Sequence, residues 1–297
     1  MSLENLIPAE RIKYNEPMKD HTTFRIGGPA DILVVPGSMS EIVQIMEWTR
    51  ERSLPYLVIG EGSNLLVRDG GFRGLVIKLG DSYNNVEFNG IEVKAQAGIK
   101  VSRLAAMAAD QGLGGLEFAE GIPGSLGGAV YMNAGAYGGE FSQVVKEAAV
   151  LNDAGEILSM GKSDLEFGYR SSSIQRYRHT VLEVKLRLHP QESHLVKERM
   201  QELSRQRKER QPLEYPSAGS TFKRPPGRFV GPMIDELGLK GFRVGDAEVS
   251  TKHAGFIVNR GQATARDVLT LVSLVQQRVK EKFGIDLKTE FLIVGED

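Results

Sequence analysis

The chain has 297 residues, of which 41% are hydrophobic and 25% are charged, and its formal net charge is −1. This composition is that of an ordinary globular protein, and the near-zero charge predicts no attraction to nucleic acid or to an anionic membrane surface. The absence of cysteine excludes disulfides, thiolate catalysis and cysteine-bound metal clusters. The five histidines follow no metal-binding spacing, so we expect no metal site.

The first twenty residues carry alternating charges and no apolar core, so they do not resemble a signal peptide. No stretch approaches the ~18 apolar residues that a membrane-spanning helix needs. We therefore expect a cytoplasmic protein, and its length predicts two domains.

The first half of the chain alternates predicted strands and helices. Ser38 and Glu41 have the spacing of a capping box at the start of a helix. Asn89-Gly90 predicts a tight hairpin turn within residues 86–97. The other predicted elements are strands at 31–36, 57–60 and 74–79 and a helix at 102–112.

The second half predicts a hairpin about Asp153-Ala154-Gly155, a strand at 180–188 and a long polar helix at 192–211. In that helix Leu195, Met200 and Leu203 form only a thin apolar stripe, which indicates a solvated helix that links two domains. The remaining predicted elements are helices at 231–237 and 264–283 and strands at 255–259 and 289–294. We thus predict an N-terminal segment at 1–21, a first domain at 22–190, a linker helix at 191–211 and a smaller α+β domain at 212–297.

Two glycine-rich segments suggest a ligand. Residues 60–66 read GEGSNLL directly after a predicted strand, and residues 121–139 read GIPGSLGGAVYMNAGAYGG. Glycine lets backbone approach a ligand closely, and successive N–H groups can converge on phosphate oxygens. Either segment alone is more often a tight turn, but two in one domain favour a large phosphate-bearing ligand. Neither a P-loop nor a GxGxxG dinucleotide fingerprint is present.

In combination these segments resemble the flavin-binding pattern of UDP-N-acetylenolpyruvoylglucosamine reductases. HTTFRIGGPAD (21–31), FGYRSS (167–172), AGSTFKRP (218–225) and TEFLIVG (289–295) match the other motifs of that family in order. The resemblance covers nearly the whole chain. It implies an α+β fold, with a two-part FAD-binding domain of the vanillyl-alcohol-oxidase type followed by a smaller α+β substrate-binding domain.

The resemblance also implies the cofactors and the sites. FAD would carry hydride from NADPH to a small-molecule substrate, a UDP-sugar enolpyruvate, and no nucleic acid or membrane partner is expected. The expected FAD-binding residues are Gly60, Gly62, Ser63, Asn64, Leu65, Gly121, Ile122, Pro123, Gly124, Ser125, Gly128, Asn133, Ala134 and Gly135. The expected substrate-binding residues are Tyr169, Lys223, Arg224, His253 and Asn259.

Three catalytic positions carry over from the family to Arg170, Ser220 and Glu290. Hydride addition to an enol ether beside a carboxylate places negative charge on that carboxylate, which a fixed guanidinium such as that of Arg170 stabilises. Protonated Glu290 would donate a hydrogen bond to the same oxygens, and Ser220 would give the proton to C2. Composition alone favours structural roles for all three: a surface ion pair for Arg170, a helix cap or turn residue for Ser220, and an exposed strand residue for Glu290.

The spacing between Arg170 and Ser220 leaves no room for the extra substrate-closing loop of the longer family members, so the chain resembles the short, second type. Two alternatives stay open at this point. One is a flavin oxidase acting on an alcohol or a sugar. The other is a non-catalytic UDP-sugar- or nucleotide-binding protein.

Overall fold

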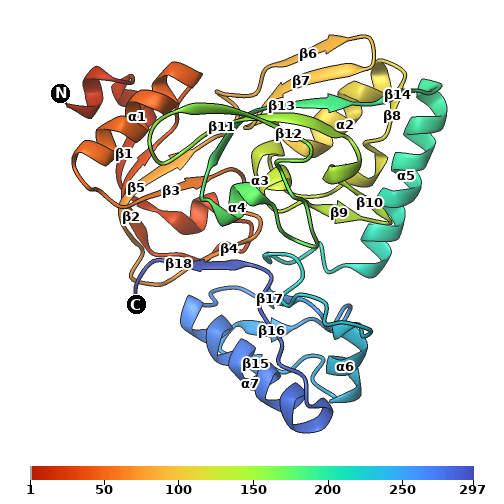
Figure 1. Ribbon diagram of the computed structural model, residues 1–297. Helices are drawn as coiled ribbons and strands as arrows, with labels where there is room; N and C mark the ends of the chain where they lie inside the picture. The colour runs from red at the N-terminus through yellow and green to blue at the C-terminus, as the bar shows by residue number, and fades with distance from the viewer. Residues whose placement is uncertain (1) are drawn as a thin grey trace. The chain divides into compact units, whose positions relative to one another are not determined.

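The computed structural model describes residues 2–297 and divides into two compact units, each built from separate stretches of the chain (Figure 1). The first unit contains the residues up to Lys13, Ile32–Glu61 and Gly74–Arg207, and the second contains Tyr14–Asp31, Gly62–Arg73 and Lys208–Asp297. Both units mix helices and strands, which confirms the predicted α+β class. The predicted domain ranges were continuous, whereas the compact units are not.

The strands are short, and most of them pair antiparallel. In chain order they are β1 Ile12–Pro17, β2 Pro29–Val34, β3 Tyr56–Ile59, β4 Leu65–Val67, β5 Phe72–Lys78, β6 Val86–Asn89, β7 Glu92–Gln96, β8 Leu113–Gly114, β9 Gly135–Ala136, β10 Gly139–Glu140, β11 Val145–Leu151, β12 Ile157–Gly161, β13 Thr180–Arg187, β14 His189–Pro190, β15 Arg243–Val244, β16 Ala247–Val249, β17 Ile257–Asn259 and β18 Leu292–Val294. The α-helices are α1 Met39–Glu51, α2 Val101–Asp110, α3 Leu126–Tyr131, α4 Ser173–Arg176, α5 Ser193–Arg210, α6 Val230–Glu236 and α7 Ala265–Phe283.

The first unit is organised around an antiparallel sheet with the strand order β12-β11-β13-β7-β6. Helix α3 packs against β13 and β7 of this sheet. A second sheet has the order β1-β2-β5-β3, in which β3 and β5 are parallel. The end of β3 carries the first glycine segment, and α3 lies within the second.

The helix and hairpin predictions hold, with two changes of detail. Ser38 caps α1 by accepting the N–H of Glu41. The Glu41 carboxylate, however, accepts from Gly37 N–H (2.6 Å) and pairs with Arg11 (2.8 Å). The return bond from Ser38 N–H to Glu41 is therefore replaced, and the predicted capping box is incomplete. The β6–β7 hairpin pairs Asn89 with Glu92, which puts the turn at Gly90 and the residue after it. Gly90 alone takes the positive φ (+59°) that this turn needs.

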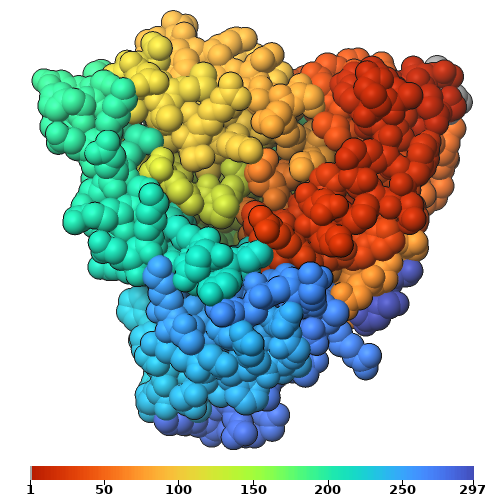
Figure 2. Space-filling model, turned by 180° about the vertical axis from the view of Figure 1, so that it is seen from behind, coloured from red at the N-terminus to blue at the C-terminus, as the bar shows by residue number. Residues whose placement is uncertain are grey.

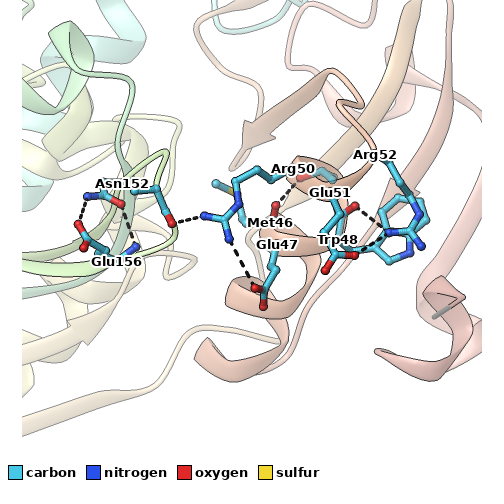
Figure 3. Close-up of polar contacts among 10 residues, drawn as sticks. Met46, Glu47, Trp48, Arg50, Glu51, Arg52, Asn152 and Glu156 are labelled. Carbon is cyan, nitrogen blue, oxygen red and sulfur yellow. Dashed lines mark hydrogen bonds and ion pairs between the residues drawn. The ribbon is translucent and has the colours of Figure 1, made fainter.

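Helix α1 is tied to the β11–β12 hairpin (Figure 3). Arg50 donates to the carbonyl oxygen of Ala154 at the hairpin tip and pairs with Glu47 on its own helix (3.4 Å). Within the hairpin, the Asn152 side chain accepts the N–H of Glu156 (2.8 Å) and donates to its carboxylate (2.9 Å). These contacts confirm the predicted turn about residues 153–155.

Helix α5 was expected to be a solvated linker, but it belongs to the first unit as far as Arg207. Figure 2 shows its outer face as a teal ridge at the protein surface. Its inner face buries Val196, Met200 and Leu203, whereas Leu195 is 44% exposed. The prediction placed Leu195 in the apolar stripe, and the neighbouring Val196 takes that position instead.

The second unit packs α7 against the antiparallel sheet β15-β16-β17. Thr264 and Asp267 form a reciprocal capping box at the start of α7, and the carboxylate of Asp69 accepts the N–H groups of Ala265 (2.8 Å) and Arg266 (3.0 Å). In the same unit β18 pairs with β4 in parallel, with Leu292 opposite Leu65. Across residues 2–297, no helix has the length and apolar character required to span a membrane.

Candidate functional site

The two glycine segments meet inside the first unit. A Cβ added to Gly60 would lie 1.9 Å from Ser125 Oγ, so only glycine allows β3 to end this close to the second segment. Ser125 is buried and caps α3, where its Oγ accepts the N–H of Gly128 at 3.5 Å. The structure thus places one residue from each predicted cofactor segment in direct proximity.

Internal hydrogen bonds fix the second segment. Leu126 N–H and Gly127 N–H donate to the carbonyl oxygens of Ile99 and Ala97, both at 2.8 Å. These two N–H groups are therefore engaged within the fold. Gly128 is exposed, and a Cβ there would meet nothing closer than Ser125 Oγ at 3.6 Å. A tight turn at Gly60 beside an accessible backbone at Gly128 fits a diphosphate-bearing ligand such as FAD.

The expected FAD residues Asn133, Ala134 and Gly135 form a loop directly after α3. Asn133 is 1% exposed, and both polar ends of its side chain are bonded: Nδ2 donates to the carbonyl of Gly168 (3.0 Å), and Oδ1 accepts from Ser142 N–H (2.9 Å). Ala134 N–H donates to the carbonyl of Ala129 at 2.7 Å. The side chain of Asn133 therefore joins this loop to the segment that contains Arg170.

Arg170 lies in a four-residue turn. Gly168 and Ser171 close the turn by exchanging two backbone hydrogen bonds of 3.0 and 3.2 Å. Arg170 has a left-handed φ of +52°, and its Nη2 donates to the carbonyl of Gly135 at 3.1 Å. Its guanidinium lies 5.3 Å from the ring centre of Tyr169, which is 53% exposed. A left-handed arginine is uncommon, and such strain is often concentrated at functional sites.

Arg207, which the sequence analysis did not select, also contacts the second glycine segment. Its stem lies 3.1 Å from the position of a Cβ on Gly121, and Nη1 donates to the carbonyl of Glu120 at 3.2 Å. Burial lowers the pKa of this guanidinium. The buried positions 196, 200, 203 and 207 of α5 have helical spacing. Extending the apolar face of this helix by one turn would therefore have predicted that Arg207 points inward.

In the second unit, the segment containing Ser220 runs beside the one containing Glu290. Thr221 O accepts the N–H of Glu290 (2.9 Å), and Phe222 and Thr289 form an antiparallel bridge. Thr221 is also buried and binds β17, where its Oγ1 accepts the N–H of Ile257 at 2.9 Å. Ser220 and Glu290 are both half-buried. Two of the predicted catalytic residues therefore lie on adjacent segments that Thr221 joins, and Thr221 is a residue that the sequence analysis missed.

The later part of the first glycine segment belongs to the same unit. Asn64 Nδ2 donates to the carbonyl oxygen of Glu290 at 3.2 Å, and Asn64 O accepts the N–H of Leu292 at 3.0 Å. Thr23, from the opening motif, donates its hydroxyl to the carbonyl of Ser217 at 2.7 Å. These bonds gather three sequence motifs around Ser220 and Glu290.

The predicted substrate residues of the second unit differ in their surroundings. Arg224 is exposed, with its guanidinium 4.5 Å from the ring centre of Phe229, and Lys223 is half-buried. Asn259 is buried, and its amide hydrogen-bonds to backbone groups of Phe24, Gly261 and Ala263. Lys223 and Arg224 are the lysine and the arginine of this predicted set, and their contact with substrate stays a prediction.

His253 packs inside the second unit. Its Nδ1 accepts the N–H of Gly255 (3.1 Å), and its ring meets Phe256 edge-on at 5.1 Å. Burial lowers its pKa, and the charge of Lys240 acts in the same direction. These contacts fix the orientation of the ring, and its role in substrate binding stays a prediction.

The predicted site residues are divided between the units. The first contains Gly60, Gly121, Ile122, Pro123, Gly124, Ser125, Gly128, Asn133, Ala134, Gly135, Tyr169 and Arg170. The second contains Gly62, Ser63, Asn64, Leu65, Ser220, Lys223, Arg224, His253, Asn259 and Glu290. Within the first unit, contacts join Gly60 to Ser125 and Arg170 to Gly135; within the second, they join Asn64 to Glu290.

Comparisons with known proteins identify two family domains along the chain. Residues 30–161 match an FAD binding domain, and residues 211–294 match the C-terminal domain of UDP-N-acetylenolpyruvoylglucosamine reductase. The curated reductase of that name from Syntrophomonas wolfei is 51% identical to this chain, and the match covers 99% of this chain and 98% of the relative. The one from Clostridium tetani is 53% identical, and the match covers 99% of this chain and 95% of the relative. The crystal structure of the reductase from Thermus caldophilus has a TM-score of 0.82 and 40% identity, covering 93% of this chain and 97% of that one.

Proposed function

Because the chain belongs to the UDP-N-acetylenolpyruvoylglucosamine reductase family, we propose that it uses NADPH and FAD to reduce UDP-N-acetylglucosamine enolpyruvate to UDP-N-acetylmuramate, a precursor of peptidoglycan. The observation that carries the proposal is that the segments containing Ser220 and Glu290 run side by side, with Asn64 of the first glycine segment bonded to Glu290 O. Neither an alcohol oxidase nor a non-catalytic binding protein matches these relatives.

Bound FAD, reduced by NADPH, supplies the hydride that adds to C3 of the enolpyruvyl double bond. The protein must then stabilise the negative charge that moves onto the substrate carboxylate. In the proposal Arg170 does so, because its guanidinium stays charged at any relevant pH and its bond to Gly135 O fixes its orientation. One such donor is typically worth about 3 kcal/mol of transition-state stabilisation.

Ser220 completes the reaction in the proposal by giving its hydroxyl proton to C2. A serine hydroxyl is a weak acid, so it must be positioned against the carbanion. The two backbone bonds of Thr221 provide that rigidity, since they fix the chain next to Ser220 between Gly255 and Glu290. Protonated Glu290 would donate to the substrate carboxylate. Lys223 and Arg224 would bind the UDP diphosphate.

An anaerobic spectrum of the purified protein tests the proposal. Stoichiometric NADPH should bleach the flavin band, and addition of the enolpyruvyl substrate should restore it with formation of UDP-N-acetylmuramate. NADH serves as the comparison nucleotide, and an enolpyruvate lacking the UDP group serves as the comparison acceptor. A flavin that NADPH does not bleach would contradict the reductant, and a reduced flavin that the substrate does not reoxidise would contradict the reaction.

A further inference from the structure

Asn133 occupies an unusual position for a residue in a glycine-rich loop. It is 1% exposed and has a left-handed φ of +44°. Asparagine tolerates this conformation better than other non-glycine residues, but burying its amide is unfavourable unless both polar ends find partners. Its side chain therefore has a specific structural task.

That task is to join three segments of the chain. Asn133 Nδ2 donates to Gly168 O, and Asn133 Oδ1 accepts from Ser142 N–H. One side chain thus connects the loop after α3, the segment leading into β11, and the turn of residues 168–171. Because the residue is only 1% exposed, little of the amide is left accessible to a ligand.

The turn that Asn133 holds is the one that carries Arg170. Arg170 is itself left-handed, and its Nη2 returns to Gly135 O, two residues beyond Asn133. Two side-chain bonds, one in each direction, therefore connect these loops. Ser172, the residue after the turn, is held separately by a bond from its Oγ to Tyr131 O (2.8 Å), so losing the Asn133 bond releases the Gly168 side of the turn.

We propose that Asn133 is a positioning residue that fixes the guanidinium of Arg170 for the reduction, and that its side chain is not a ligand of FAD. The inference rests on the proposed function of Arg170. It replaces the expectation that the Asn133 side chain binds the cofactor, while leaving the neighbouring glycines as cofactor contacts. A displacement of about 1 Å in a positioned group can lower a rate about 100-fold, so we expect losses of about 10- to 100-fold when the bond to Gly168 O is removed.

Two substitutions separate the bonds of Asn133. Asn133→Asp, studied at pH 8, keeps an acceptor for Ser142 N–H but removes the donor to Gly168 O. Asn133→Gly removes both bonds and suits the left-handed backbone, so it guards against misfolding. The matched control is Asn152→Asp, because Asn152 also bridges a loop through both ends of its amide but lies in the β11–β12 hairpin (Figure 3).

Each holoenzyme is measured in three ways: FAD dissociation constant, rate of flavin reduction by NADPH, and rate of reoxidation by substrate. Both Asn133 variants should keep the first two within about threefold of wild type and slow the third. The same substitutions are then made together with Arg170→Ala. If Asn133 acts through Arg170, the double variants should reoxidise no more slowly than Arg170→Ala alone.

A loss of FAD affinity larger than the loss in reoxidation rate would overturn the inference, as would additive effects in the double variants. So would failure of both Asn133 variants to fold, because the amide would then serve the fold itself. Normal reoxidation by the Asn133 variants beside a slow Arg170→Ala would contradict the inference alone. Normal reoxidation by Arg170→Ala would contradict the proposed function as well.

Discussion

Gly60 lies against Ser125 so closely that a methyl group on Gly60 would fall 1.9 Å from the serine Oγ and 2.8 Å from its Cβ. The first atom pair is far inside van der Waals contact. Because Gly60 ends β3 and Ser125 caps α3, this contact sets how closely the strand approaches the helix. The close approach has consequences for both stability and cofactor binding.

Gly60→Ala should destabilise the protein by about 1–3 kcal/mol, the usual cost of overpacking a buried site. Urea denaturation of the FAD-free protein measures the free energy of unfolding. Adding Ser125→Gly removes both clashing atoms, so the double variant should recover part of the loss despite losing the helix cap. Strictly additive losses in the double variant would show that the contact does not constrain the packing.

Gly128→Val tests whether the backbone at Gly128 approaches the cofactor, because the substitution should leave the fold unchanged. The added side chain begins 3.6 Å from the nearest atom and points to solvent, so the FAD-free protein should unfold within about 1 kcal/mol of wild type, the helix-propensity range for such a change. The FAD dissociation constant, from quenching of flavin fluorescence, should rise at least about tenfold if backbone approaches the diphosphate there. Gly161→Val, at the end of the edge strand β12, is the control. Wild-type affinity in Gly128→Val would remove this residue from the cofactor site.

Ser220→Ala should separate the two half-reactions. Flavin reduction by NADPH does not involve the proposed proton donor and should stay near wild type. Reoxidation by the enolpyruvyl substrate should slow by about 10²–10⁴-fold, the usual contribution of general acid catalysis. Ser220→Cys retains a transferable proton and should restore part of the rate. Stopped-flow absorbance at the flavin band follows both steps, and unchanged reoxidation in Ser220→Ala would leave Ser220 as a turn residue.

His253 should make the protein less stable in mild acid. Burial lowers its pKa in the folded state below the usual value near 6.5, so the unfolded chain binds the proton more readily. The stabilisation is complete above pH 6.5 and is lost as the pH falls through the lowered folded pKa. His253→Asn keeps an acceptor for Gly255 N–H but does not titrate. The free energy of unfolding should fall more steeply for wild type than for His253→Asn between pH 7 and pH 5, and parallel curves would contradict the assignment.

The sequence predicted those helices and hairpins whose stabilising contacts lie between residues close together in the chain. Thr264 and the apolar spacing behind it marked α7, and Asp153–Gly155 marked a hairpin. Strands β1 and β4 were not predicted, because their partners lie far away along the chain and neither has a strong alternating pattern. Side-chain partners were equally hard to foresee: the Glu41 carboxylate pairs with Arg11 instead of completing its capping box.

The candidate site shows the same limit. The motifs located Ser220 and Glu290. Nothing local in the sequence revealed that Thr221 accepts hydrogen bonds from both Glu290 and Ile257. Asn133 was selected for its motif, whereas its partner Gly168 is 35 residues away. Motif resemblance identifies which residues matter, and long-range pairing decides what each of them contacts.

The pairing of β4 with β18 affects how the chain is made. Asn64 and Glu290 are separated by 226 residues, so a ribosome exposes β4 long before its partner strand exists. Until then Leu65–Val67, buried in the finished protein, present unpaired backbone and apolar side chains. Such distant contacts are slow to form because a long loop must close first. The second unit should therefore mature only after translation reaches its last strand, and nascent chains stalled after α5 should depend on chaperones.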